Sequence, residues 1–252
     1  MRLLRRLAMI SALPKMHGHG AIAAHGRADM QRRIVALPIA LAAIVLLMLG
    51  VPRTVGVILS ARADPVLRKL QDHQPVQSDE LMTLAGAQEA GRFWLADGRL
   101  RTDLGLAYLL LAEKLPRKDP NANAYLQRAI DALAAGLARA PANPYAWARL
   151  AYAEALSKGW SPLAVSSLRM ALITAPYEPR LLWSRLRMSL LAWPEMSRED
   201  SQLIYQQIRY AWQADPAELA RLSTELKQVD QVRAALLLSP DESATFEELL
   251  KK

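Results

Sequence analysis

The chain has 252 residues, of which 52% are apolar, so it can bury a substantial core and does not have the composition of a disordered protein. It contains no cysteine, which excludes disulfides, thiolate metal sites and cysteine nucleophiles. Most of its net charge of +8 lies before residue 34, and this uneven placement argues against a nucleic-acid-binding domain.

The first predicted element is a basic arm over residues 1–33, which contains seven Lys or Arg residues and only one acidic residue. Its histidines, His17, His19 and His25, lie among glycines. This composition is more typical of an unstructured tail than of a fixed metal site, so we predict no metal site. We expect the arm to lie in the cytoplasm.

An uncharged apolar run follows from Ile34 to Val51. A membrane-spanning helix needs about 20 apolar residues. We therefore expect a transmembrane helix over 34–52, in which residues 34–51 contact the lipid. The arginines before it place the N-terminus in the cytoplasm by the positive-inside rule. The pattern predicts a single-pass protein of a bacterial inner membrane, whose C-terminal part lies in the periplasm.

A cleaved signal peptide is the alternative to a retained anchor. Ala61, Arg62 and Ala63 have the small–x–small form of a cleavage site, and Met30 is a second possible start. The apolar run is longer than the usual signal-peptide core of about 7–15 residues, which favours the anchor. With either reading, a linker over 53–77 leads to a periplasmic domain over 78–252.

Capping residues followed by proline divide this domain into helices. The side-chain oxygen of Asp, Asn or Ser accepts free backbone N–H groups, and Pro fits the first helical position. The pairs are Asp119-Pro120, Asn143-Pro144, Ser161-Pro162, Asp215-Pro216 and Ser239-Pro240. With no convincing strand between them, they predict an all-α fold. We expect helices near residues 64–72, 78–97, 100–114, 120–139, 144–157, 162–175, 179–193, 197–213, 216–236 and 240–251.

An internal repeat is visible in this region. Leu137-x-x-Ala140-Pro141-x-x-Pro144 recurs 35 residues later as Leu172-x-x-Ala175-Pro176-x-x-Pro179, and such a period is typical of paired-helix solenoids. On this pattern, residues 98–216 resemble the tetratricopeptide repeat (TPR) family. The residues that match its packing positions are Leu104, Gly105, Tyr108, Trp147, Leu150, Ala164, Leu168, Ala171 and Pro176. The resemblance implies a short TPR-like α-solenoid of antiparallel helix pairs.

The resemblance also implies a groove, lined by the first helix of each pair, that binds peptides or partner helices. Its candidate residues are Arg99, Tyr145, Tyr152, Arg180, Trp183 and Arg187. Tyr, Trp and Arg are the residue types that dominate binding hot spots. Packing in the core is an alternative role for the aromatic residues. A solvated face is the alternative for the basic cluster Arg180, Arg185 and Arg187, which otherwise suits an anionic partner.

No catalytic constellation is present, so we predict neither an enzyme nor a cofactor. His73 is the only histidine after the apolar run, and Glu154 is the one carboxylate considered for a glycosidase-like reaction. We expect a scaffold that binds other envelope proteins. The segment Ala175–Arg180 is similar to accessory proteins of bacterial exopolysaccharide biosynthesis. The alternatives are a direct binder of an anionic polysaccharide, or a subunit for cytochrome c maturation or translocon chaperoning; no nucleic-acid partner is predicted.

Overall fold

The computed structural model describes residues 18–251, with side chains from residue 38 onward. This range is helical and contains no strand, so the predicted all-α class is confirmed for it. The chain divides into two units, Met1–Pro52 and Arg53–Lys252. Its elements are α1 (Gly18–Ser60), η1 (Ala61–Ala63), α2 (Asp64–Gln71), α3 (Ser78–Trp94), α4 (Gly98–Glu113), α5 (Pro120–Leu137), α6 (Pro144–Lys158), α7 (Pro162–Thr174), α8 (Leu182–Leu191), η2 (Trp193–Glu195), α9 (Arg198–Ala214), α10 (Pro216–Glu225), α11 (Val229–Leu236) and α12 (Pro240–Leu249).

The first unit contains most of α1. This helix begins at Gly18, so the expectation of an unstructured arm is wrong for residues 18–33. Alanines favour helix there, and the segment extends a helix that the apolar run has already nucleated, which avoids the cost of starting a new one. Residues 1–17 of the arm, which include His17, lie outside the described residues.

One described helical stretch, Pro38–Gln71, is long and apolar enough to cross a membrane. Its most apolar 18-residue window has a mean hydropathy of 2.2, and only 6% of that window is buried. Large apolar side chains such as Leu46 and Met48 are exposed, as expected of a helix that faces lipid. Length and composition therefore agree with the predicted membrane span.

The segment 53–77 was expected to be a linker that contains one helix near 64–72. That helix is present as α2, but the segment belongs to the second unit. Ala63, Val66 and Val76 are buried in one cluster with Leu81 and Leu84 of α3. The expectation was wrong because these apolar residues find their partner in α3, which the local sequence of the segment does not reveal. The folded unit therefore begins before residue 78.

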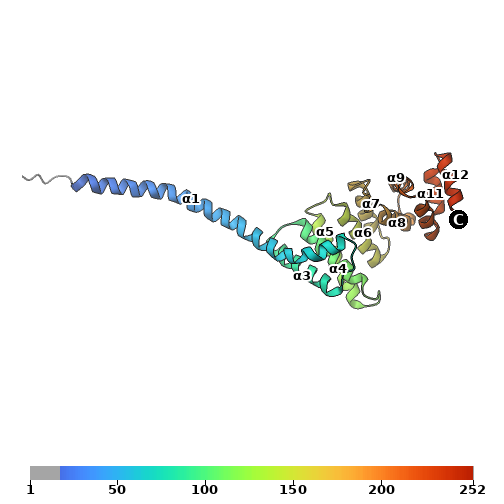
Figure 1. Ribbon diagram of the computed structural model, residues 1–252, viewed down its shortest axis with the longest axis horizontal. Helices are drawn as coiled ribbons and strands as arrows, with labels where there is room; N and C mark the ends of the chain where they lie inside the picture. The colour runs from blue at the N-terminus through green and yellow to red at the C-terminus, as the bar shows by residue number, and fades with distance from the viewer. Residues whose placement is uncertain (1–17, 252) are drawn as a thin grey trace, which may run out of the picture. The chain divides into compact units, whose positions relative to one another are not determined.

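Successive helices of the second unit follow one another in chain order (Figure 1). Contacts are most extensive between α4 and α5 and between α6 and α7. Two glycines allow the first pair to approach closely. A Cβ atom on Gly105 would lie 2.5 Å from Leu133 Cγ, and one on Gly136 would lie 2.6 Å from Thr102 Cγ2. There is therefore no room for a side chain at either position while α4 and α5 stay at their present distance.

The predicted packing residues lie between or beside these helices. Six are buried, namely Leu104, Gly105, Leu150, Ala164, Leu168 and Ala171. Tyr108 and Trp147 are half-buried against the core clusters, and the Trp147 Nε1–H donates to the Pro141 carbonyl at 2.7 Å. Pro176 is exposed, and its carbonyl accepts from Gln207 Nε2 at 2.7 Å. The helices are thus paired, while membership of the TPR family stays a prediction.

One expected helix, over 216–236, is in fact two. The break is at Lys227, whose φ of 57° is left-handed. The N–H of Gln228 donates to the Ser223 carbonyl at 2.8 Å, and that of Lys227 donates to the Thr224 carbonyl at 3.1 Å, which is the hydrogen-bond pattern of a Schellman ending. This ending could not be predicted from the sequence, because the left-handed position is occupied by lysine rather than by glycine, the usual signal.

Candidate partner-binding groove

Three of the six predicted groove residues line one pocket of about 310 Å³. Arg99 comes from α4, Tyr145 from α6, and Arg180 from the segment that precedes α8. Side chains of α2 complete the wall. We call this pocket the α4–α6 groove. The structure therefore brings together residues that are up to 81 positions apart in the chain.

The charges of the α4–α6 groove are predominantly positive. Arg99, Arg149 and Arg180 line it together with one carboxylate, Asp103. Arg99 Nε lies 3.7 Å from Asp103 Oδ2. Burial raises the pKa of Asp103 although Arg149 and Arg99 oppose the change, and burial likewise lowers the pKa of Arg149. Desolvation thus outweighs the attraction between Asp103 and Arg149, and a carboxylate of a ligand would offset the cost of burying the Arg149 charge.

Glu178 borders the groove beside Tyr145. Burial is the main cause that raises the pKa of Tyr145, and the Glu178 carboxylate adds to it. The same carboxylate accepts from the Arg180 backbone N–H at 3.3 Å. The Tyr145 hydroxyl therefore stays protonated and can donate, and Glu178 holds the segment that carries Arg180 near α6.

Apolar side chains form the remaining wall. Leu67 and Leu70 of α2 line the groove together with Leu106 and Leu110 of α4. His73 also lines it, in a left-handed conformation (φ 55°) that ends α2. The groove thus combines apolar surface with arginines, as the centres of protein–protein interfaces commonly do.

Sequence reasoning missed the α2 wall, Asp103 and Arg149. The signal for the last two was present, because each follows a predicted groove residue by four positions and so shares its helix face: Asp103 follows Arg99, and Arg149 follows Tyr145. No comparable signal marks α2, because its place in the groove depends on contacts with distant helices.

Tyr152 lies in a different pocket, of about 380 Å³, which is lined also by Glu113 and Arg117. Burial, and then the hydrogen bond with Glu113, raises the pKa of Tyr152 to about 12. Although Tyr145 and Tyr152 come from the same helix, the structure does not place Tyr152 among the residues that line the α4–α6 groove. Tyr152 therefore offers a matched control position on the same helix.

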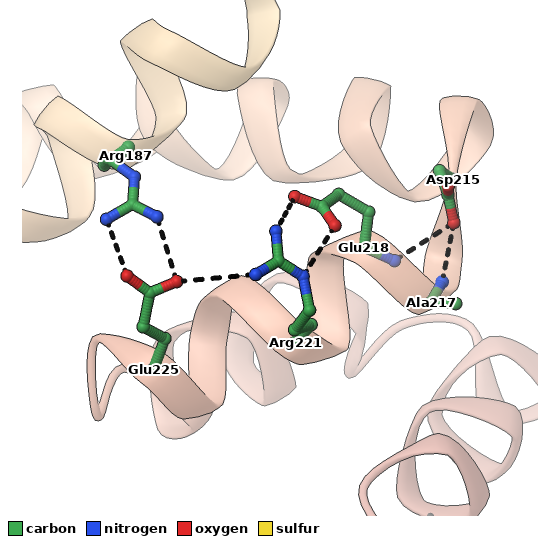
Figure 2. Close-up of polar contacts among 6 residues, drawn as sticks. All are labelled: Arg187, Asp215, Ala217, Glu218, Arg221 and Glu225. Carbon is green, nitrogen blue, oxygen red and sulfur yellow. Dashed lines mark hydrogen bonds and ion pairs between the residues drawn. The ribbon is translucent and has the colours of Figure 1, made fainter.

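Trp183 and Arg187 of α8 belong to the C-terminal part of the fold. Trp183 packs against the core cluster of α8–α12. The Arg187 guanidinium makes two parallel hydrogen bonds of 2.9 Å with Glu225 of α10 (Figure 2). Glu225 also lies 3.8 Å from Arg221, so Arg187 belongs to an ion-pair network that joins two helices rather than to the groove.

The network continues to the start of α10. Arg221 donates to Glu218 through Nε at 2.8 Å and through Nη2 at 2.5 Å. Asp215 accepts from the backbone N–H groups of Ala217 and Glu218, both at 3.0 Å, and so caps the helix as the sequence predicted (Figure 2). These contacts lie within α10 and its N-terminal cap, and the Arg187–Glu225 pair is the one that joins this network to α8.

Arg185, the third member of the predicted basic cluster, is 0% exposed. Its Nη1 donates to the carbonyls of Ala171 at 2.8 Å and Ala175 at 2.6 Å, and burial lowers its pKa. Arg185 is therefore a buried hydrogen-bond donor for carbonyl groups at the end of α7. Arg180, Arg185 and Arg187 have three separate environments and do not form one basic face.

Glu154, the residue considered for glycosidase-like chemistry, is only 6% exposed. Its Oε2 accepts from Ser167 Oγ at 2.8 Å, and burial raises its pKa. This carboxyl group holds α6 against α7 and is closed to a polymeric substrate. Among the described residues, no group of three or more His, Asp or Glu side chains is arranged to hold a metal ion.

No protein-family model, curated protein or solved structure matches the chain. The interpretation of the α4–α6 groove therefore depends on the chemistry of its own residues.

Proposed function

We propose that this protein is a single-pass membrane-anchored adaptor, and that its α4–α6 groove binds an acidic segment of another envelope protein. In this proposal α1 crosses the inner membrane, the N-terminus is cytoplasmic and the helical domain is periplasmic. The helix of sufficient length and apolarity supports the anchor. The basic residues on its N-terminal side support the orientation.

The observation that carries the proposal is the convergence of Arg99, Arg149 and Arg180 on a groove whose other walls include leucines. A partner segment with carboxylates and apolar side chains would complement both features. Tyr145 adds a hydroxyl donor on a rigid ring, a combination that is common at hot spots. The groove of about 310 Å³ is of a size to hold a few side chains of such a segment.

The setting that we propose is an envelope assembly for exopolysaccharide biosynthesis or export. Cytochrome c maturation and translocon chaperoning are alternative settings for the same adaptor role. A direct interaction with an anionic polysaccharide is a second candidate function, because the same three arginines would attract a polymer of carboxylates. The experiment below separates protein from polymer.

A photo-crosslinking amino acid, p-benzoylphenylalanine, placed at Tyr145 of the full chain in cell membranes is expected to form one discrete adduct with a partner protein. Arg180→Glu in the same chain is expected to reduce the adduct by about tenfold, because it reverses a charge that faces the acidic segment. The matched control places the crosslinker at Tyr152, which lines a separate pocket of the same helix. The readout is immunoblotting followed by mass spectrometry of the adduct.

Equal adducts at both positions, or no adduct at Tyr145, would contradict the groove proposal. An adduct whose added mass is removed by polysaccharide-degrading enzymes would instead support the polymer. A partner whose crosslinked peptide carries no acidic residue would also count against an electrostatic fit.

A further inference from the structure

A second concavity lies between α3, α4 and α5. Its α4 residues, Arg101, Leu104 and Tyr108, face away from the α4–α6 groove, because they are on the opposite side of the helix from Asp103 and Leu106. Its volume is about 570 Å³. Each of the three helices contributes one guanidinium group: Arg92, Arg101 and Arg128. We call it the three-arginine pocket.

The acids of this pocket neutralise only one of its three arginines. Glu89 pairs with Arg92, and Asp131 accepts from Gln127 Nε2 at 2.9 Å. Within the part of the chain that the structure describes, no carboxylate lies within ion-pair distance of Arg101 or Arg128. Two of the three guanidinium groups are therefore available to an incoming anion.

The charge of Arg101 is destabilised by burial and by neighbouring arginines. Its Nε and that of Arg92 are buried, and neither has a hydrogen-bond partner in the described structure. Burial lowers the pKa of Arg101, and the charges of Arg139 and Arg92 lower it further. Because arginine stays charged under all ordinary conditions, a bound anion would relieve both the desolvation and the repulsion.

The third arginine is positioned by aromatic rings. Arg128 Cζ lies 5.8 Å from the centroid of the Tyr108 ring. That ring stacks on Tyr125, with a centroid distance of 6.0 Å and an interplanar angle of 18°. A cation held over an aromatic face loses part of its freedom before a ligand arrives, which lowers the entropic cost of binding.

We propose that the three-arginine pocket binds an oxyanion, a carboxylate or phosphate group carried by a small molecule or by the end of a polymer. Guanidinium groups bind such groups through two parallel hydrogen bonds. Pockets that hold small molecules measure roughly 300–1,000 Å³, so the volume suits a ligand larger than a bare ion. This site lies outside the α4–α6 groove and does not depend on its proposed function.

The test is a thermal unfolding titration of the full chain in detergent, with inorganic phosphate and glucuronate as probes and sodium chloride at equal ionic strength as reference. We expect at least one probe to raise the melting temperature in a saturable manner. Arg101→Gln is expected to raise the half-saturating concentration about tenfold. The matched control is Arg68→Gln, which removes an exposed arginine of α2 outside this pocket.

Identical titrations of the wild type, Arg101→Gln and Arg68→Gln would overturn the proposal, because they would show a general anion effect. A wild type that responds to neither probe would overturn it as well. Arg128→Gln supplies a second variant if Arg101→Gln does not fold, since Arg128 is exposed and its replacement leaves the core intact. Its half-saturating concentration is also expected to rise.

Discussion

Replacing Arg185 with methionine is expected to lower the free energy of unfolding by about 3 kcal/mol. Arg185 is 0% exposed and donates to the carbonyls of Ala171 and Ala175 near the end of α7. Methionine retains the apolar stem but leaves these acceptors without a donor. A buried acceptor that loses its partner costs about 1–3 kcal/mol, and a cation at a helix C-terminus is favourable in addition.

Removing the buried charge also removes its desolvation cost, which by itself would stabilise the variant. This gain does not replace the two hydrogen bonds to the carbonyl groups. The measurement is denaturant unfolding of the full chain in detergent, followed by circular dichroism. The matched control is Arg187→Met on the same helix, which breaks an exposed ion pair with Glu225 and should change stability little. Equal losses for the two variants would show that Arg185 has no special structural role.

Gly136→Ala is expected to destabilise the protein by about 1–3 kcal/mol, although alanine is the better helix former. The added methyl group would lie 2.6 Å from Thr102 Cγ2, 2.9 Å from the Gly98 carbonyl oxygen and 3.0 Å from the Thr102 nitrogen. Two of these three atoms belong to the backbone, so α4 and α5 would have to separate. That separation would loosen the closest helix pair of the domain.

Gly86→Ala is the control for this substitution, because Gly86 is helical and exposed and has nothing within 4 Å of an added Cβ atom. It should stabilise the protein by up to about 1 kcal/mol through helix propensity alone. Opposite signs for the two variants in thermal unfolding would confirm that the α4–α5 contact sets the cost. A Gly136→Ala protein as stable as the wild type would contradict the packing described for this pair.

The helices were predictable because their start signals are local. The side chains of Asp119, Asn143, Ser161 and Asp215 each accept a backbone N–H at the start of the helix that the sequence predicted. Ser239 does not, although α12 still begins at the proline that follows it. Proline alone can therefore mark the start of a helix, because it fixes φ even where the capping side chain makes no hydrogen bond.

The site was only partly predictable because its walls come from distant segments. Arg99, Tyr145 and Arg180 could be chosen from their places on the expected helices, and they do line one pocket. Arg187 could not be assigned in the same way, because its partner Glu225 is 38 residues away and lies on a helix whose end at Lys227 has no glycine. The wall formed by α2 required contacts that no local pattern encodes.

The position of Ala63 bears on the order of events as the protein matures. Ala63 is 0% exposed and ends η1, where it packs in the same cluster as α3. Proteases cut exposed and mobile segments, so a leader peptidase could reach the Ala61–Ala63 site only before the domain closes over it. If the chain is cleaved after Ala63, as the signal-peptide alternative requires, cleavage would have to precede the folding of α3 onto this residue, and a change that slows that folding would favour the shorter chain.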